Sequence, residues 1–343
     1  MSPQQPASDL TYFALAATAA APPPVEPRAA PGALPEVFAG RYRIERLLGV
    51  GGMGAVYRAR DLLREQYGDP QPHVALKTLS EDFAEYPDAS ALLYSEYALT
   101  TRLSHRHVVR LYQFDVDPTS QRAFITLELL KGPTLDELLA ERPGGLPWDE
   151  LREIALALLE ALAYSHGLGV LHGDLKPSNV MLADDGLRLF DYGLGQPMEG
   201  LLPGLPRLCR NRFSAWTPRY AALELLDGGE LTAAADLFAV ACVLYELASG
   251  SHPFRRLSAR QAKAMELDRS LQCPRHLPAH CWPALRTAWR STKRSGRSTS
   301  RGCCKPFAVT PRIACGAGSD APTDDTHTRK SPCSLRPMKP ASA

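Results

Sequence analysis

Polar residues crowd into the segment from His172 to Asn179, which runs HGDLKPSN. Short apolar runs at 169–171 and 180–182 flank it, so the sequence predicts a polar loop between two short strands. A second group, Asp191-Tyr192-Gly193, follows the apolar residues 187–190. Two aspartates and an asparagine on loops between strands provide one general base and two ligands for a hard metal ion. The blander interpretation, two unrelated Asx turns, loses weight when both groups occur in this order.

A glycine-rich turn stands far upstream, Gly49-Val50-Gly51-Gly52-Met53-Gly54, and the β-type sequence Ala55-Val56-Tyr57 follows it. The pattern G-x-G-x-x-G is weak by itself, because dinucleotide sites also use it. In those sites the glycines open a helix, whereas here the loop joins two expected strands. Glycines in such a loop let backbone N–H groups face phosphate oxygens. A plain glycine-rich hairpin is an equally good interpretation of this motif taken alone.

Lys77 ends the next β-type segment, His73-Val74-Ala75-Leu76-Lys77, in which it alternates with apolar neighbours. Glu96 lies within an expected helix over 88–103, and it could supply the counter-charge that an ammonium group in a cleft needs. Either residue could equally be a solvent-exposed charge. The spacing alone does not choose between these interpretations.

Taken in order, these motifs resemble the signature set of protein kinases: a glycine-rich loop, a V-A-x-K strand, a helix glutamate, an H-x-D-L-x-x-x-N loop and D-[FY]-G. The chain is similar to bacterial Ser/Thr protein kinases of the eukaryotic-like (Hanks) type. Residues 217–224, TPRYAALE, stand where such kinases carry T-P-x-Y-x-A-P-E, and residues 236–241, DLFAVA, match their D-x-x-S-x-G. The resemblance covers about residues 38–289.

The resemblance implies roles for three residues in the transfer step. Asp174 matches the catalytic base that orients the substrate hydroxyl and accepts its proton. Lys176 matches the lysine that neutralises charge on the transferring phosphoryl group. Thr217 matches the threonine that bridges this aspartate and lysine in Ser/Thr kinases. The D-L-K-P-x-N form around Lys176 and the presence of Thr217 therefore imply specificity for Ser and Thr hydroxyls.

The resemblance also implies that ATP and Mg²⁺ are used. Lys77 would hold the α- and β-phosphates while it pairs with Glu96, and Asn179 and Asp191 would be the Mg²⁺ ligands. The implied ATP-binding set comprises the glycine-rich turn, the apolar plates around adenine, the gatekeeper position Leu127 and the adjoining backbone: Leu48, Gly49, Val50, Gly51, Gly52, Met53, Gly54, Ala55, Val56, Ala75, Lys77, Leu127, Glu128, Leu130 and Met181.

The elements that must position these residues fall into two groups. Strand patterns and one helix precede Gly132-Pro133, and helical periodicity dominates after it. The expected strands are 42–48, 55–57, 73–77, 108–114 and 123–130, and the expected helices include 88–103, 151–168 and 231–249. We therefore expect an α+β, bilobal, protein-kinase-like fold over 39–290. A small β-rich lobe with one helix would span 39–130, and a larger, mainly helical lobe 131–290.

Composition limits the other possibilities. The 343 residues suffice for about two domains, and a net charge of +2 argues against coating nucleic acid or anionic lipid. No apolar run is long enough to span a membrane, and the apolar residues 10–21 lack the basic flank of a secretory signal. We expect a cytoplasmic location, protein substrates with Ser or Thr, self-phosphorylation, and no nucleic-acid or membrane partner.

The two ends differ from the middle of the chain. Residues 1–38 are rich in Ala and Pro without periodicity, which predicts a disordered leader. Residues 291–343 carry ten Lys or Arg against three Asp or Glu, which predicts an irregular basic tail. The family expects another amphipathic helix there. The abrupt change of composition resembles translation in a shifted reading frame or a truncated end of the large lobe.

Two departures from the family pattern bear on function. Gly173 replaces the arginine of H-R-D, which clamps a phosphorylated activation loop in the family, so we expect activity without such phosphorylation. Tyr192 replaces phenylalanine and adds a hydroxyl. The alternative to an active kinase is a catalytically silent, kinase-like, nucleotide-binding scaffold. Against this alternative, Lys77, Asp174 and the two expected metal ligands are all present. A small-molecule phosphotransferase ranks last.

Overall fold

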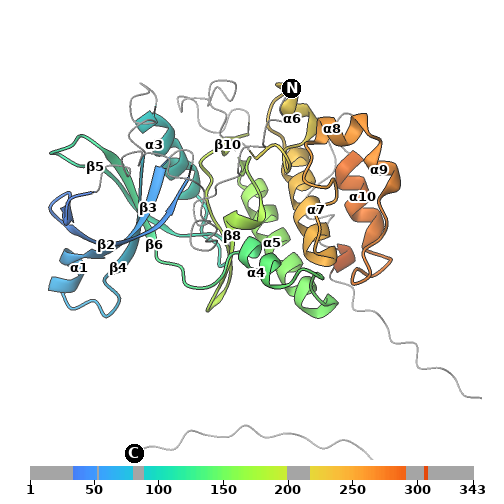
Figure 1. Cartoon of the computed structure of the whole chain (residues 1–343). Helices are drawn as coiled ribbons and strands as arrows, with labels where there is room; N and C mark the ends of the chain where they lie inside the picture. Colours follow the sequence, from blue (N-terminus) through green and yellow to red (C-terminus); the bar gives the residue numbers. More distant parts are fainter. Residues whose placement is uncertain (1–33, 52–53, 80–88, 199–216, 291–304, 308–343) are drawn as a thin grey trace, which may run out of the picture. The chain divides into compact units, whose positions relative to one another are not determined.

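The computed structural model describes residues 34–51, 54–79, 89–198, 217–290 and 305–307. A six-stranded antiparallel sheet carries the first part of the chain, in the strand order β1-β2-β3-β4-β6-β5 (Figure 1). Its strands are β1 Val37–Phe38, β2 Tyr42–Val50, β3 Gly54–Asp61, β4 His73–Leu79, β5 Leu111–Val116 and β6 Ala123–Glu128. With helices α1 (Leu62–Gln66) and α3 (Ala89–Thr100) it forms the sheet lobe.

Apolar side chains cover both faces of this sheet. Helix α3 packs Leu92 and Leu93 together with Ile125 of β6. On another part of the sheet the rings of Phe38 and Phe124 meet edge to face, with centroids 5.1 Å apart. Each such buried side chain contributes about 1.5–3 kcal/mol relative to exposure, so packing on both faces sets the register that carries Lys77 to its place.

Three details of the sheet lobe differ from the sequence-based expectation. Residues 37–38, expected to belong to a disordered leader, form β1 and pair with β2, because the side chain of Phe38 is buried. Helix α1 was not expected, and Asp61 caps it by accepting from the backbone N–H groups of Leu63 and Arg64. Strand β5 begins at Leu111 rather than at Val108, because Val108 instead bridges to Leu189 of the other lobe. That bridge ties the two lobes together beside the polar loops.

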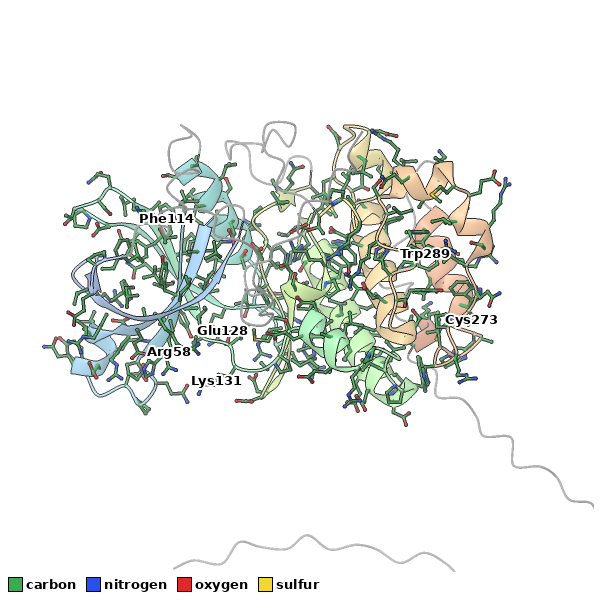
Figure 2. The ribbon with its side chains drawn as sticks, viewed as in Figure 1. Arg58, Phe114, Glu128, Lys131, Cys273 and Trp289 are labelled. Atoms are coloured by element: carbon green, nitrogen blue, oxygen red, sulfur yellow. The ribbon has the colours of Figure 1, made fainter. Side chains whose placement is uncertain are left out.

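The second part of the chain is mainly helical. Its helices are α4 Leu135–Glu141, α5 Trp148–Gly167, α6 Leu223–Leu226, α7 Ala233–Ser249, α8 Ala259–Ala264, α9 Leu267–Ser270 and α10 Trp282–Arg290. Short strands β7 Val170–Leu171, β8 Val180–Ala183, β9 Gly186–Leu189 and β10 Gln196–Pro197 carry the polar loops. We call this part the helical lobe. Glu128 and Lys131 lie where the chain passes from one lobe to the other (Figure 2). The described residues therefore have the bilobal protein-kinase fold.

Helices α5 and α7 form the centre of the helical lobe. Most of α7 is buried, as its apolar composition predicts. Thr232 caps its start, where the hydroxyl accepts from Ala235 N, and Gly250 caps its end in the left-handed conformation with φ 72°. This buried pair of helices provides the rigid base on which the loops after β7 and β9 rest. No helix in the described part of the chain is long and apolar enough to cross a membrane.

Three residues beyond the last long helix pack back onto the helical lobe. Phe307 is 1% exposed, its ring centroid lies 6.0 Å from that of Trp148, and Arg152 Nε donates to its carbonyl oxygen at 3.0 Å. His280 Nε2 contacts the Pro306 carbonyl oxygen at 3.0 Å. This differs from the irregular segment expected after residue 290, because a large apolar side chain gains free energy by burial. Most of the expected leader and the rest of the tail lie outside the described residues.

Candidate active site

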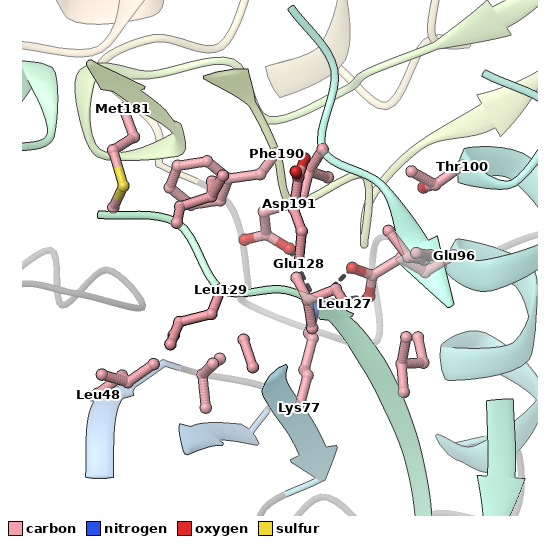
Figure 3. Close-up of a pocket in the computed structure, with 16 residues that line it drawn as sticks. Leu48, Lys77, Glu96, Thr100, Leu127, Glu128, Leu129, Met181, Phe190 and Asp191 are labelled. Atoms are coloured by element: carbon pink, nitrogen blue, oxygen red, sulfur yellow. Dashed lines mark hydrogen bonds and ion pairs between the residues drawn. The ribbon is translucent and has the colours of Figure 1, made fainter. Parts of the chain in front are cut away.

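A pocket that is partly open to solvent lies between the two lobes. Leu48 on the side of the sheet and Met181 on the side of the helical lobe lie on opposite sides of it (Figure 3). Lys77, Glu96 and Asp191 supply charged groups at one end, while its walls are otherwise mostly apolar. A mostly apolar cleft with a few converging polar groups is typical of a site for a small organic ligand.

Lys77 is the centre of a buried ion cluster. Its Nζ lies 2.6 and 2.5 Å from the two carboxylate oxygens of Glu96 and 3.0 Å from Asp191 Oδ1. Burial by itself raises the pKa of Asp191, but the charges of Lys77 and Lys176 outweigh it and hold this pKa below its usual value. Burial raises the pKa of Glu96 against the opposing attraction of Lys77. The three residues come from β4, α3 and the loop after β9.

The loop after β7 holds a second cluster around Asp174. Lys176 Nζ donates to Asp174 Oδ2 at 2.5 Å and to Thr217 Oγ1 at 3.1 Å. Asn179 Nδ2 donates to the Asp174 carbonyl oxygen at 2.8 Å. The other polar side-chain atom of Asn179, Oδ1, is buried and accepts no hydrogen bond from the described residues. A buried acceptor left this way is costly unless a ligand satisfies it.

Asp236 at the start of α7 anchors this loop. Its carboxylate accepts from the backbone N–H groups of His172 and Gly173, each at 2.9 Å, and His166 Nε2 lies 2.8 Å away. Burial lowers the pKa of His172, which favours a neutral ring. Its Nδ1 accepts from Asp174 N at 3.3 Å, so Nε2 carries the proton and donates to the Phe190 carbonyl oxygen at 3.1 Å. Gly173 has φ 81°, which an unstrained arginine would not adopt.

Tyr192, in the loop after β9, connects that loop to α5 through its side chain. Its ring centroid lies 4.5 Å from that of His172, and its hydroxyl lies 2.9 Å from Ser165 Oγ. Burial raises the pKa of Tyr192 well above its usual value, so the hydroxyl keeps its proton. A Cβ on neighbouring Gly193 would lie 3.2 Å from both Asp191 Oδ1 and Glu96 Oε2, so a side chain there would crowd the two carboxylates.

The glycine-rich turn connects β2 and β3. Gly51 N donates to the Gly54 carbonyl oxygen at 2.7 Å, and Gly52 and Met53 lie outside the described residues. A Cβ on Gly54 would come within 2.0 Å of the Thr78 carbonyl oxygen, so the close approach of β4 demands a glycine here. This reason is independent of any phosphate.

The implied ATP-binding set divides into two groups in the structure. The members that line the pocket are Leu48, Val56, Ala75, Lys77, Leu127, Glu128, Leu130 and Met181. The described turn residues Gly49, Val50, Gly51, Gly54 and Ala55 lie at the adjoining end of the β2–β3 hairpin and are not part of its lining.

Sequence reasoning missed several lining residues: Thr100, Val109, Leu111, Ile125, Leu129 and Phe190. Of these, Thr100 carried a signal, since it follows Glu96 by one helical turn and therefore lies on the same face of α3. The others are apolar residues whose pattern predicts burial without indicating what they face.

Comparisons with known proteins bear on the family and the fold of this chain. Residues 42–306 match the family model of the protein kinase domain, so the chain belongs to the protein kinase family. The kinase domain of PknI from Mycobacterium tuberculosis, a solved structure, has 25% identity and a TM-score of 0.57, over 81% of this chain and 98% of that one.

Curated relatives are bacterial Ser/Thr kinases. The DNA damage-responsive serine/threonine-protein kinase RqkA of Deinococcus radiodurans is 37% identical over 227 residues, which are 65% of this chain and 31% of RqkA. The serine/threonine-protein kinase PkaA of Streptomyces coelicolor is 31% identical over 281 residues, 76% of this chain and 49% of PkaA. The chain therefore spans about a third to a half of the length of these relatives.

Proposed function

We propose that this chain transfers the γ-phosphoryl group of ATP to Ser and Thr hydroxyls of protein substrates, its own included. The proposal rests on one observation: the ammonium group of Lys176 donates to both Asp174 Oδ2 and Thr217 Oγ1. A carboxylate and an ammonium group held together suit a reaction in which a hydroxyl loses a proton while phosphoryl charge is neutralised. The curated relatives RqkA and PkaA support the Ser/Thr class.

In this proposal the pocket binds the nucleotide. The adenine ring would lie between Val56 and Ala75 on the sheet side and Met181 on the other, beyond Leu127. The backbone of Glu128 and Leu130 would meet the edge of the adenine ring. The turn from Gly49 to Gly54 would cover the phosphates, and Lys77 would hold the α- and β-phosphates while Glu96 keeps its ammonium group in place.

The residues around Asn179 fit a Mg²⁺ ion. Mg²⁺ binds oxygen ligands and takes one or two carboxylates together with substrate phosphates. Asn179 Oδ1 is a buried acceptor without a partner among the described residues, and Asp191 supplies a carboxylate whose lowered pKa keeps it ionised. In the described residues no three His, Cys, Asp or Glu side chains cluster as a metal site, so phosphates would complete the coordination. When bound, Mg²⁺ would neutralise charge on the phosphates.

The chain's own residues would then act by position and charge. Asp174 would orient the substrate hydroxyl and accept its proton, and Lys176 would neutralise charge on the phosphoryl group as it moves. Thr217 holds the ammonium group of Lys176 from the other side at 3.1 Å. Such pre-organised charge is the main contribution that a protein makes to phosphoryl transfer. The proposal includes a cytoplasmic location, where ATP is supplied.

The test is a transfer assay on the purified chain with γ-labelled ATP, Mg²⁺ and casein as a generic protein acceptor. We expect label on Ser or Thr of casein and of the chain itself. Asp174→Asn should reduce transfer by at least about 1,000-fold while nucleotide binding stays within about threefold. Asp184→Asn, an exposed aspartate nearby, is the matched control and should leave transfer unchanged.

Two results would contradict the proposal. Wild-type chain that binds ATP but transfers no label would instead support the silent scaffold. Transfer that survives Asp174→Asn at the wild-type rate would remove Asp174 from the reaction.

A further inference from the structure

Asp191 has an unusual backbone conformation for a residue that carries chemistry. Its φ is 65°, in the left-handed region that residues with a Cβ adopt only at a cost. The surroundings must therefore hold it there. Its carboxylate meets Lys77, but a single ion pair at the end of a side chain does not by itself determine the backbone.

The next residue supplies a stronger restraint. The hydroxyl of Tyr192 lies 2.9 Å from Ser165 Oγ, and both residues are buried, at 1% and 0% exposure. Ser165 Oγ donates its only proton to the Ala161 carbonyl oxygen at 3.0 Å. Tyr192 must therefore be the donor in the Tyr192–Ser165 hydrogen bond. Its acceptor is fixed on α5, a helix buried against α7.

We propose that the Tyr192–Ser165 hydrogen bond holds Asp191 in the pocket, which makes Tyr192 and Ser165 positioning residues for the Mg²⁺-ligating carboxylate. The inference rests on the proposed function, in which Asp191 is that ligand. Movement of Asp191 out of the pocket would carry Tyr192 with it. The tyrosine hydroxyl would then lose its only acceptor among the described residues, and breaking a buried hydrogen bond without replacement is unfavourable.

The direction of the hydrogen bond predicts an asymmetry between the two partners. Tyr192→Phe removes the donor, and Ser165 keeps its bond to Ala161, so no buried polar group is left without a partner. Ser165→Ala removes the acceptor and leaves the tyrosine hydroxyl buried and unpaired, which favours displacement of the segment. The pair Tyr192→Phe/Ser165→Ala removes both groups and should therefore behave like Tyr192→Phe alone.

The experiment measures binding of Mn²⁺, a paramagnetic substitute for Mg²⁺, by electron paramagnetic resonance in the presence of a non-hydrolysable ATP analogue. We expect Mn²⁺ affinity to fall about threefold in Tyr192→Phe and about tenfold in Ser165→Ala. The Mn²⁺ affinity of the double variant Tyr192→Phe/Ser165→Ala should lie within twofold of that of Tyr192→Phe. Tyr164→Phe is the matched control. It removes a hydroxyl from the same helix, but this hydroxyl accepts a hydrogen bond from Ser104 N and has no part in the Tyr192–Ser165 bond. Mn²⁺ affinity should not change in this variant.

Mn²⁺ affinity in Ser165→Ala within twofold of wild type would overturn the inference. The inference would also be overturned if the double variant Tyr192→Phe/Ser165→Ala bound Mn²⁺ as weakly as Ser165→Ala alone. Ser165 would then act through packing and not through the hydrogen bond. A merely structural role would lower the melting temperature without moving Mn²⁺ affinity. If Ser165→Ala does not fold, Tyr192→Phe decides: an affinity equal to wild type overturns the inference, and a threefold loss supports it. Wild-type chain that binds no Mn²⁺–nucleotide would overturn the proposed function, and the inference with it.

Discussion

Lys77 Nζ lies 3.0 Å from Asp191 Oδ1 although 114 positions separate the two residues along the chain. The same ammonium group also holds Glu96 from α3. One cation therefore joins two carboxylates, one from each lobe, at the end of the pocket. Because Lys77 is only 6% exposed, water does little to screen these interactions.

The first prediction concerns this cation. Lys77→Met leaves the carboxylate of Glu96 buried without its counter-charge and removes from Asp191 the ammonium group 3.0 Å away. We expect the free energy of unfolding to fall by about 3–5 kcal/mol and phosphoryl transfer to fall at least about 100-fold. Urea unfolding and the transfer assay measure the two effects separately.

A double variant separates the structural effect from the functional one. Lys77→Met/Glu96→Met replaces a buried ion pair by apolar side chains, a change that is often neutral for stability. We expect most of the lost stability to return while transfer stays low. Recovered transfer in this variant would show that the lysine matters only for folding.

The second prediction is a pH dependence from His252. Burial, together with the charges of Arg219 and Arg256, lowers its pKa to about 3. The unfolded chain takes up a proton near pH about 6.5, and the folded chain does not. Stability therefore falls as the pH drops below about 6.5. Acidification from about pH 7 to about pH 5 should cost about 2 kcal/mol through this residue.

Unfolding titrations at several pH values check this prediction. His252→Asn cannot titrate, but its side-chain oxygen can still accept from the backbone N–H groups of Phe254 and Arg256, as His252 Nδ1 does. We expect a flatter pH profile of stability in this variant. His276→Asn, at an exposed position, should keep the wild-type slope. An unchanged slope in His252→Asn would mean that other groups cause the acid sensitivity.

The third prediction concerns the segment around Phe307. Phe307→Ala should destabilise the chain by about 3–5 kcal/mol, because a large buried side chain leaves a cavity against Trp148. Lys305→Ala, at an exposed position of the same segment, should change stability by less than about 0.5 kcal/mol. If Phe307→Ala were as stable as Lys305→Ala, the segment would add nothing to stability. That result would support the interpretation that the chain after residue 290 comes from translation in a shifted reading frame.

The fourth prediction concerns control by phosphorylation. Gly173 has φ 81° and uses its backbone N–H to bond Asp236, and it has no side chain to clamp a phosphate. We therefore expect phosphatase treatment to leave the rate of transfer unchanged. Ser214, a candidate phosphorylation position, lies outside the described residues. Loss of activity in Ser214→Ala and in Thr217→Ala, with rescue by an acidic residue at either position, would contradict this expectation.

Much of the fold could be predicted because local patterns determine local structure. The long helices α5 and α7 follow from apolar periodicity, and strands β2 to β6 follow from β-type runs between turns, whereas the two-residue strand β1 was not predicted. The residues of the candidate site were identified for a similar reason, since HGDLKPSN and DYG place their functional groups at short, fixed spacings. Their catalytic and binding roles remain predictions. Helix α1 was missed because a single capping residue, Asp61, decides it.

The amino-acid order by itself determined the family of this protein and the side chains available to its chemistry. Only the tertiary structure decided which of these groups meet: Lys77 with both Glu96 and Asp191, and the Tyr192 hydroxyl with Ser165. It also decided that Phe307 packs against the helical lobe. The physical reason is that periodicity reports only whether a residue faces the interior. Which partner it finds there depends on how elements distant in the chain pack against one another.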